Sequence, residues 1–303
     1  MGNCCSDQQA ITTDSMSLNH MKGQNSDEFF SNADFIAQLQ AHRKRIDNPM
    51  SEIEELESIP PEKLRFKREI EKEHGELKLP QKYMNPNLPF IGPIRLKDGG
   101  IYQGQFHNEM KFGVGEIFYN DNSYYYGTFR DDVKNGVGRL VHAKGDFFEG
   151  DWENDIANGY GRYKGDEAEY QGSWKENQQH GHGKEKWING DVYEGNYVEG
   201  AKHGTGIFKF DNGDEYEGEF NEDQISGYGV YKFKNGKIYK GDWVNCKMDG
   251  TAEVIWPDGR KFIGKYQDDK KHGPGRWEFP DGKIFKGEWE NGSQVGPYQE
   301  IHQ

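Results

Sequence analysis

Gly2, Cys4 and Cys5 are the residues whose types and spacing point most directly to chemistry. The chain starts M-G-N-C-C-S, which fits the M-G-x-x-x-[ST] pattern for N-myristoylation of Gly2. One myristoyl chain gives only marginal membrane binding, so stable attachment needs a second signal. Residues 1–26 contain one lysine against two aspartates, which excludes a polybasic patch there. We therefore predict palmitoylation of Cys4 and Cys5 beside the myristate.

Histidine is the other residue type that could bind a ligand. His180 and His203 recur at one position of an internal repeat and should lie about 10 Å apart, too far to share an ion held at about 2 Å. His180 and His182 form the one near pair, without a cysteine close by. The segment 211–222 has a tyrosine where a calcium loop needs glycine, and no G-x-G pair extends into a phosphate loop. We therefore predict no metal, no cofactor and no enzymatic activity.

Composition narrows the function further. The 303-residue chain has a net charge of -14, which argues against a nucleic-acid partner because phosphate binding needs a basic surface. No apolar stretch approaches the roughly 20 residues of a membrane-spanning helix or resembles a secretory signal. The three cysteines are an odd number and form no disulfide framework. These features indicate a protein of a reducing, intracellular compartment.

The elements that must carry any function are repeats. A motif of the form aromatic-x-glycine-x-aromatic occurs nine times, with a spacing of 23 residues except for one unit of 22. The nine units start at residues 102, 125, 148, 170, 193, 216, 239, 262 and 285. Repeat positions 3 and 12 are glycine in all nine units, and position 14 is glycine in seven. A fixed period of this size indicates a repeat architecture.

Each unit is predicted to form two antiparallel strands, roughly at positions 1–6 and 13–19, with a turn at positions 7–11. Most units close with Asn-Gly or Asp-Gly, as at residues 189–190, which favours a type I′ hairpin turn. Counting back from Tyr102 places a half repeat at residues 92–101. We therefore expect the sheet to begin near residue 92.

Aromatic side chains at positions 1 and 5 share one face of the first strand with the glycine at position 3. We expect a ring to lie across that glycine and the rings to stack into a ladder. These rings are either the core or, in part, a surface that binds a partner. The predicted ladder contains Tyr102, Phe106, Tyr125, Phe129, Trp152, Tyr170, Trp174, Tyr193, Tyr197, Tyr216, Phe220, Tyr239, Trp243, Tyr266 and Trp289.

The pattern resembles MORN (membrane occupation and recognition nexus) repeats, and the segment YEGEF-NEDQISGYG at 216–229 is similar to the family consensus. The resemblance covers residues 92–303, and the 22-residue third unit and the truncated ninth unit depart from it. It implies a mainly β fold: an elongated, single-layer antiparallel β-hairpin ribbon. It also implies a scaffold or lipid-proximal module, with no catalysis unless a second domain is attached.

The region before the repeats is predicted to contain a flexible tether (1–26), a helical region (27–83) and a linker (84–91). Ser26 could cap a first helix, and Ser51 with Glu54 forms a second capping box. Pro61 is predicted to start a charged helix that ends near Glu73. These helices either cover the first edge of the sheet or lie on a membrane.

The function that follows is a non-enzymatic scaffold held by acyl chains on the cytoplasmic face of a membrane, at the plasma membrane or cell cortex. Its repeats would bind cytoskeletal or signalling proteins, or phosphoinositide headgroups. One alternative is a soluble structural part of a cytoskeletal or ciliary assembly, similar to a radial-spoke component. Another is the regulatory subunit of a separate lipid kinase. The sequence leaves a homodimer open.

Overall fold

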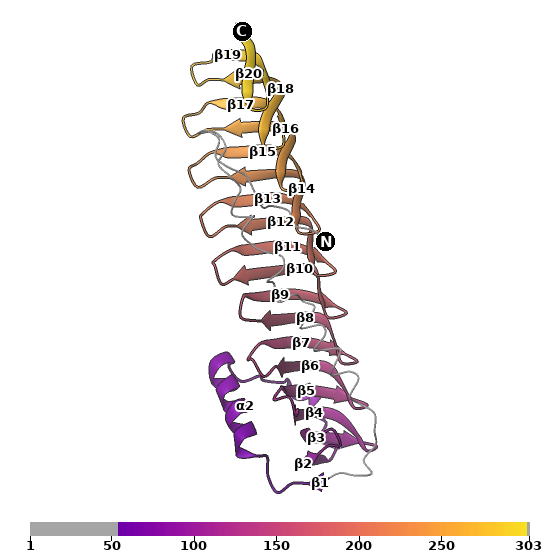
Figure 1. The fold of residues 1–303 in the computed structure, drawn as a ribbon. Helices are drawn as coiled ribbons and strands as arrows, with labels where there is room; N and C mark the ends of the chain where they lie inside the picture. Colours follow the sequence, from indigo (N-terminus) through magenta and orange to yellow (C-terminus); the bar gives the residue numbers. More distant parts are fainter. Residues whose placement is uncertain (1–53, 302–303) are drawn as a thin grey trace. The chain divides into compact units, whose positions relative to one another are not determined.

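The computed structural model describes residues 54–301, and it confirms the predicted fold class. Twenty strands form one open antiparallel hairpin sheet, with a single α-helix in the described part of the chain (Figure 1). The described residues divide into two compact units, which we call the N-terminal unit (54–181) and the C-terminal unit (182–301). No helix among residues 54–301 has the length and apolar character to cross a membrane.

The N-terminal unit contains β1 (Glu54–Glu55), α2 (Pro61–His74), the 3₁₀ turn η1 (Gln81–Tyr83), β2 (Phe90–Arg95), β3 (Ile101–His107), β4 (Met110–Phe118), β5 (Tyr124–Arg130), β6 (Val133–Val141), β7 (Phe147–Glu153), β8 (Ile156–Lys164) and β9 (Ala168–Lys175). The unit boundary falls within β10 (Gln178–Trp187). The C-terminal unit continues with β11 (Val192–Val198), β12 (Ala201–Lys209), β13 (Glu215–Asn221), β14 (Gln224–Lys232), β15 (Ile238–Val244), β16 (Lys247–Ile255), β17 (Lys261–Gln267), β18 (Lys270–Glu278), β19 (Ile284–Glu290) and β20 (Ser293–Ile301).

The two strands of each repeat are joined by a two-residue turn at positions 7 and 8, and the second strand starts at position 9, earlier than predicted. In the second repeat these turn residues are Asp131 and Asp132, with φ of 49° and 70°. Positive φ at both central residues defines the type I′ turn, which the sequence had placed at the Asn-Gly pairs instead. That placement is wrong: at 189–190 only Gly190 has positive φ.

The position-8 side chain explains why residues other than glycine adopt this conformation. Where it is Asp or Asn, it reaches the preceding repeat and accepts a hydrogen bond from the backbone N–H at position 10. Asp132 accepts from Lys111 at 2.9 Å, and Asp155 accepts from Lys134 at 2.8 Å. Asn and Asp tolerate left-handed φ better than other residues with side chains, and each of these hydrogen bonds satisfies a strand amide.

The aromatic ladder is the core of one face in both units. In the N-terminal unit each position-1 ring meets the position-5 ring of its own repeat edge-on, and the first three also meet that of the next repeat, at 5.0–5.6 Å between centroids and 78–90° between planes. In the C-terminal unit the corresponding contacts are 4.9–5.9 Å and 68–89°. Edge-to-face pairs add to the area that the rings bury.

Glycines let the position-1 rings lie flat on the sheet. A Cβ built on Gly218 would meet the Tyr216 ring and would lie 2.6 Å from the Cα of Gly229 on the paired strand. The Tyr216 hydroxyl then donates to the carbonyl of Glu219 at 3.0 Å. Tyr102 repeats this arrangement over Gly104, donating to Gln105 at 3.0 Å. The expected ring-over-glycine packing is therefore present.

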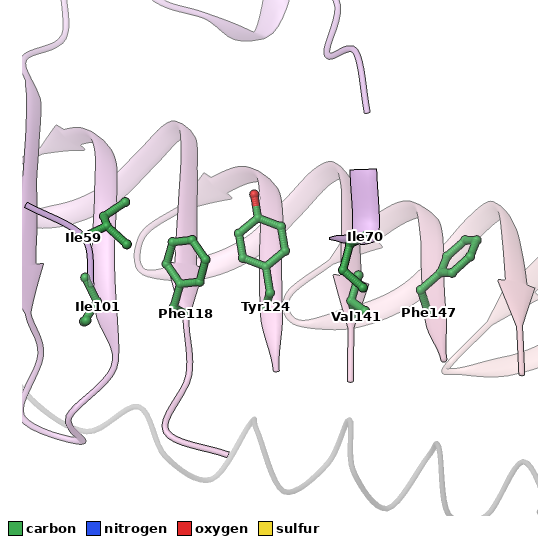
Figure 2. Packing of buried hydrophobic residues seen from close by; sticks show 7 residues of the cluster. All are labelled: Ile59, Ile70, Ile101, Phe118, Tyr124, Val141 and Phe147. Atoms are coloured by element: carbon green, nitrogen blue, oxygen red, sulfur yellow. The ribbon is translucent and has the colours of Figure 1, made fainter. Parts of the chain in front are cut away.

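Helix α2 lies on the other face of the sheet, which carries positions 0, 2, 4, 13, 15 and 17 and which we call the second face. It begins at Pro61, whose fixed φ suits a first helical position, and Gly75 follows its last residue. Figure 2 shows Ile70 among side chains from five successive strands. The whole buried cluster is Ile59, Ile70, Ile101, Phe118, Tyr124, Val141 and Phe147.

Two expectations for the N-terminal region are corrected. Glu54 lies in β1, which pairs with β2 through Glu54–Arg95 and Glu55–Ile94, and not in the first turn of a helix as the predicted capping box requires; Ser51 lies outside the described residues. Helix α2 covers a face of the sheet and not its edge, because its apolar side packs on the β3–β7 cluster. The pairing of β2 with β1 covers that edge strand instead. The predicted tether and first helix lie outside the described residues.

Ion pairs fix the position of α2, and Lys67→Ala tests them. The Lys67 ammonium lies 2.8 Å from the Glu116 carboxylate, which is almost fully buried. Removing the ammonium should lower the free energy of unfolding by about 1 kcal/mol and speed amide hydrogen exchange in α2. Arg65→Ala is the control, since its pair with Glu69 is exposed and should cost less than about 0.5 kcal/mol. Equal effects of both variants would contradict this docking.

Candidate functional site

The ladder residues offer little surface for a partner. All fifteen predicted ladder rings are buried, with at most 7% of their surface exposed. Lysines at position 10 cover them further: the ammonium groups of Lys202 and Lys134 each lie 5.7 Å from the centre of a ladder ring, Tyr193 and Tyr125 respectively. Any surface available for binding must therefore be sought elsewhere on the sheet.

The predicted ladder leaves out a second row of core aromatics, at positions 16 and 18. In the C-terminal unit, Phe208 stacks with Trp187 at 5.6 Å, and Phe210 lies 5.7 Å from Tyr231. The signal was present as large residues alternating with small ones on the second strand of each unit. These rings, like the ladder, belong to the core.

The second face of the N-terminal unit shows how this sheet binds a helix. Position 15 makes the polar contacts: Glu116 pairs with Lys67, and the Arg139 guanidinium donates to the carbonyl of Gly75 at 2.6 Å. Glu116 also accepts from Tyr124 at 2.6 Å, and burial together with this carboxylate raises the pKa of the Tyr124 hydroxyl. Apolar side chains at positions 0 and 17 lie beneath the helix.

As far as residues 54–301 are concerned, the second face of the C-terminal unit is uncovered along repeats 6–9, where it is hollowed into a groove of about 730 Å³. Its floor includes Ile263 and the bare backbone of Gly264 and Gly275. Charged side chains border the groove; they are Lys240, Asp242, Glu253, Lys265, Arg276 and Lys286. The exposed Tyr228 lies at one end of this stretch of strands.

The other candidate residues are the possible metal ligands, Cys246 and the predicted acylation sites, and none of them forms a site within residues 54–301. Among residues 54–301, no group of three or more histidine, cysteine or acidic side chains is arranged to hold a metal ion. Cys246 is half-buried at position 8 of a type I′ turn, with φ of 63°. Gly2, Cys4 and Cys5 lie outside the described residues, so their acylation remains a prediction.

Comparison with known proteins defines the class of this chain. The MORN repeat family model matches eight segments: 102–124, 125–147, 148–166, 170–192, 193–215, 216–238, 239–259 and 262–284. The chain therefore belongs to the MORN repeat family, whose repeats indicate a scaffold or binding role. The hairpin of β19 and β20 continues the same pairing beyond the last matched segment. No curated protein matches the sequence.

Several solved structures show a limited likeness. One is the TCP10 domain of Danio rerio CPAP in complex with a STIL peptide, at 9% identity and a TM-score of 0.34 over 69% of this chain and 93% of that chain. Another is the SAS-4 TCP domain of Drosophila melanogaster with a proline-rich motif of Ana2, at 14% identity and a TM-score of 0.24 over 70% and 96%. Scores this low support no statement about function.

Proposed function

We propose that this protein is a non-enzymatic scaffold that acyl chains hold on the cytoplasmic face of a membrane, at the plasma membrane or cell cortex. The observation that supports the scaffold role is that the two faces of the sheet differ in what covers them. One face is filled by its own aromatic core, and the second face accepts α2 in the N-terminal unit, whereas no other part of residues 54–301 covers it in the C-terminal unit. Protein partners or phosphoinositide headgroups would bind to the open second face.

The anchor follows from charge and from the start of the sequence. A chain with a net charge of -14 is repelled by an anionic membrane surface, so electrostatic attraction cannot hold it there. Myristate on Gly2 supplies one anchor, and palmitate on Cys4 and Cys5 supplies the second that stable binding requires. Together they would keep the repeats close to the membrane while leaving the sheet exposed to cytoplasmic partners.

Cell fractionation tests this proposal. We expect the wild-type protein in the membrane fraction, and Gly2→Ala largely in the cytosol because the myristate is lost. Cys4→Ser/Cys5→Ser should also move to the cytosol, since a single myristoyl chain binds only marginally. Cys246→Ser is the matched control, because this thiol lies within the folded sheet, and it should fractionate as wild type. If all four proteins distribute alike, the proposed anchor is wrong.

A further inference from the structure

The groove on the second face of the C-terminal unit has an excess of positive charge in an acidic protein. Four basic side chains border it against two carboxylates. Both carboxylates already have partners: Glu253 lies 3.5 Å from Lys240, and Asp242 accepts from the amide and the hydroxyl of Thr251 at 2.8 and 2.7 Å. The positive charge of the groove is therefore only partly compensated.

Lys265 and Lys286 make up the uncompensated part. Both are exposed, and within residues 54–301 neither has a carboxylate at ion-pair distance. Lys286 also stands directly opposite Arg276 on the paired strand, and the Arg276 guanidinium already has the Glu278 carboxylate as its partner at 2.8 Å. These two exposed ammonium groups can therefore attract an anionic partner.

The packing of helix α2 shows which kind of partner the second face of this sheet can bind. In the N-terminal unit the second face binds an amphipathic helix through an apolar strip and through a helix cation on a position-15 carboxylate. The strands of the C-terminal unit pair in the same register, position 15 opposite position 2, as in Arg276 opposite Lys286. The groove has two position-15 side chains: Glu253, which pairs with Lys240, and Arg276, whose charge is opposite to that of Glu116.

We infer that this groove binds an acidic amphipathic helix of a partner protein. Apolar side chains of that helix pack on Ile263, Tyr228 and the half-buried glycine backbone, while its carboxylates meet Lys265 and Lys286. Helix-in-groove recognition of this kind combines apolar anchors with charge complementarity at the rim. The inference deepens the scaffold part of the proposed function by naming the surface and the chemistry of the partner.

A peptide titration with the purified, unacylated full-length protein tests the inference. The probe is a fluorescent designed helix of about 18 residues with leucines on one side and glutamates on the other, compared with the same helix carrying lysines. We expect the glutamate helix to bind at least about tenfold more tightly, with an affinity that falls as salt is raised. Lys265→Glu/Lys286→Glu should weaken its binding by about tenfold or more and improve binding of the lysine helix.

The control is Lys234→Glu/Lys270→Glu, which changes the charge by the same amount at two exposed lysines that do not line the groove. It should alter binding of the glutamate helix by less than about twofold. The inference is overturned if both helices bind alike, if both double variants weaken binding equally, or if vesicles with phosphatidylinositol bisphosphate need Lys265 and Lys286 while the helix does not. Fractionation is measured separately, so a failure here leaves the anchor untouched.

Discussion

Replacing Asp155 by asparagine is expected to lower the free energy of unfolding by about 3 kcal/mol, because it leaves the Lys134 ammonium buried without a counter-charge. Lys134 and Asp155 are 2% and 3% exposed, with 3.1 Å between Nζ and Oδ1. Burial lowers the pKa of Lys134, whereas the Asp155 carboxylate raises it. Urea denaturation measures the loss, and amide hydrogen exchange locates it in β6–β8.

The next repeat supplies the control. There Ala157 and Asn177 occupy the same two positions, and Asn177 Oδ1 accepts from the Ala157 amide at 2.7 Å, as Asp155 does from Lys134. The double variant Lys134→Ala/Asp155→Asn reproduces this natural pair and should be at least about 1 kcal/mol more stable than Asp155→Asn. A double variant less stable than Asp155→Asn would contradict the role given to the ion pair.

The stability of the single variant Asp155→Asn should depend on pH in a defined direction. Between the lowered pKa of folded Lys134 and its unfolded value near 10.4, the unfolded chain binds more protons than the folded one. The stability of Asp155→Asn should therefore rise with pH across this window relative to wild type, whose Asp155 opposes the shift. Urea midpoints of the two proteins at a series of pH values give the comparison.

Gly218→Ala is expected to lower the free energy of unfolding by about 2–3 kcal/mol. Its new Cβ would meet the Tyr216 ring and would lie 2.6 Å from the Cα of Gly229. The backbone of a paired strand cannot move away without breaking hydrogen bonds between the two strands. The Tyr216 ring is also held between Phe220 and Trp243. Urea denaturation and near-ultraviolet circular dichroism of the aromatic rings would detect the change.

Gly229→Ala, at position 14 of the same repeat, is the control and should cost only about 1 kcal/mol. The seventh repeat has Ala252 at this position, and there the ring of Tyr239 remains buried but tilts, making 68° with Trp243. A ring can thus move aside for a Cβ at position 14. Equal losses from Gly218→Ala and Gly229→Ala would show that backbone contact is not the deciding factor.

The regular part of the fold could be predicted from the sequence, because the same local pattern occurs in all nine repeats. The ladder, the ring-over-glycine packing and the helix from Pro61 follow from side-chain periodicity, glycine placement and a proline start. The turns were misplaced because the left-handed conformation of Asp132 and Asp155 is stabilised by a hydrogen bond from an amide in the preceding repeat. Turn rules based on neighbouring residues do not include such a contact.

The candidate site was harder to predict than the fold. Whether the aromatic rings are core or surface depends on how completely the sheet, its neighbouring rings and the position-10 lysines cover them. The docking of α2 depends on Lys67 meeting Glu116 across 49 residues of sequence. The groove arises where small residues at positions 3 and 14 leave backbone bare beneath side chains from several repeats, and its charge appears only when Lys265, Arg276 and Lys286 are brought together.

Mass spectrometry of the N-terminal peptide, isolated from the cells that make this protein, tests the central claim most directly. The account predicts an amide-linked myristoyl group on Gly2 and thioester-linked palmitate on Cys4 and Cys5, of which hydroxylamine removes only the palmitate. A peptide that carries neither acyl chain would contradict the claim that this MORN-repeat scaffold is held at a membrane by its first residues.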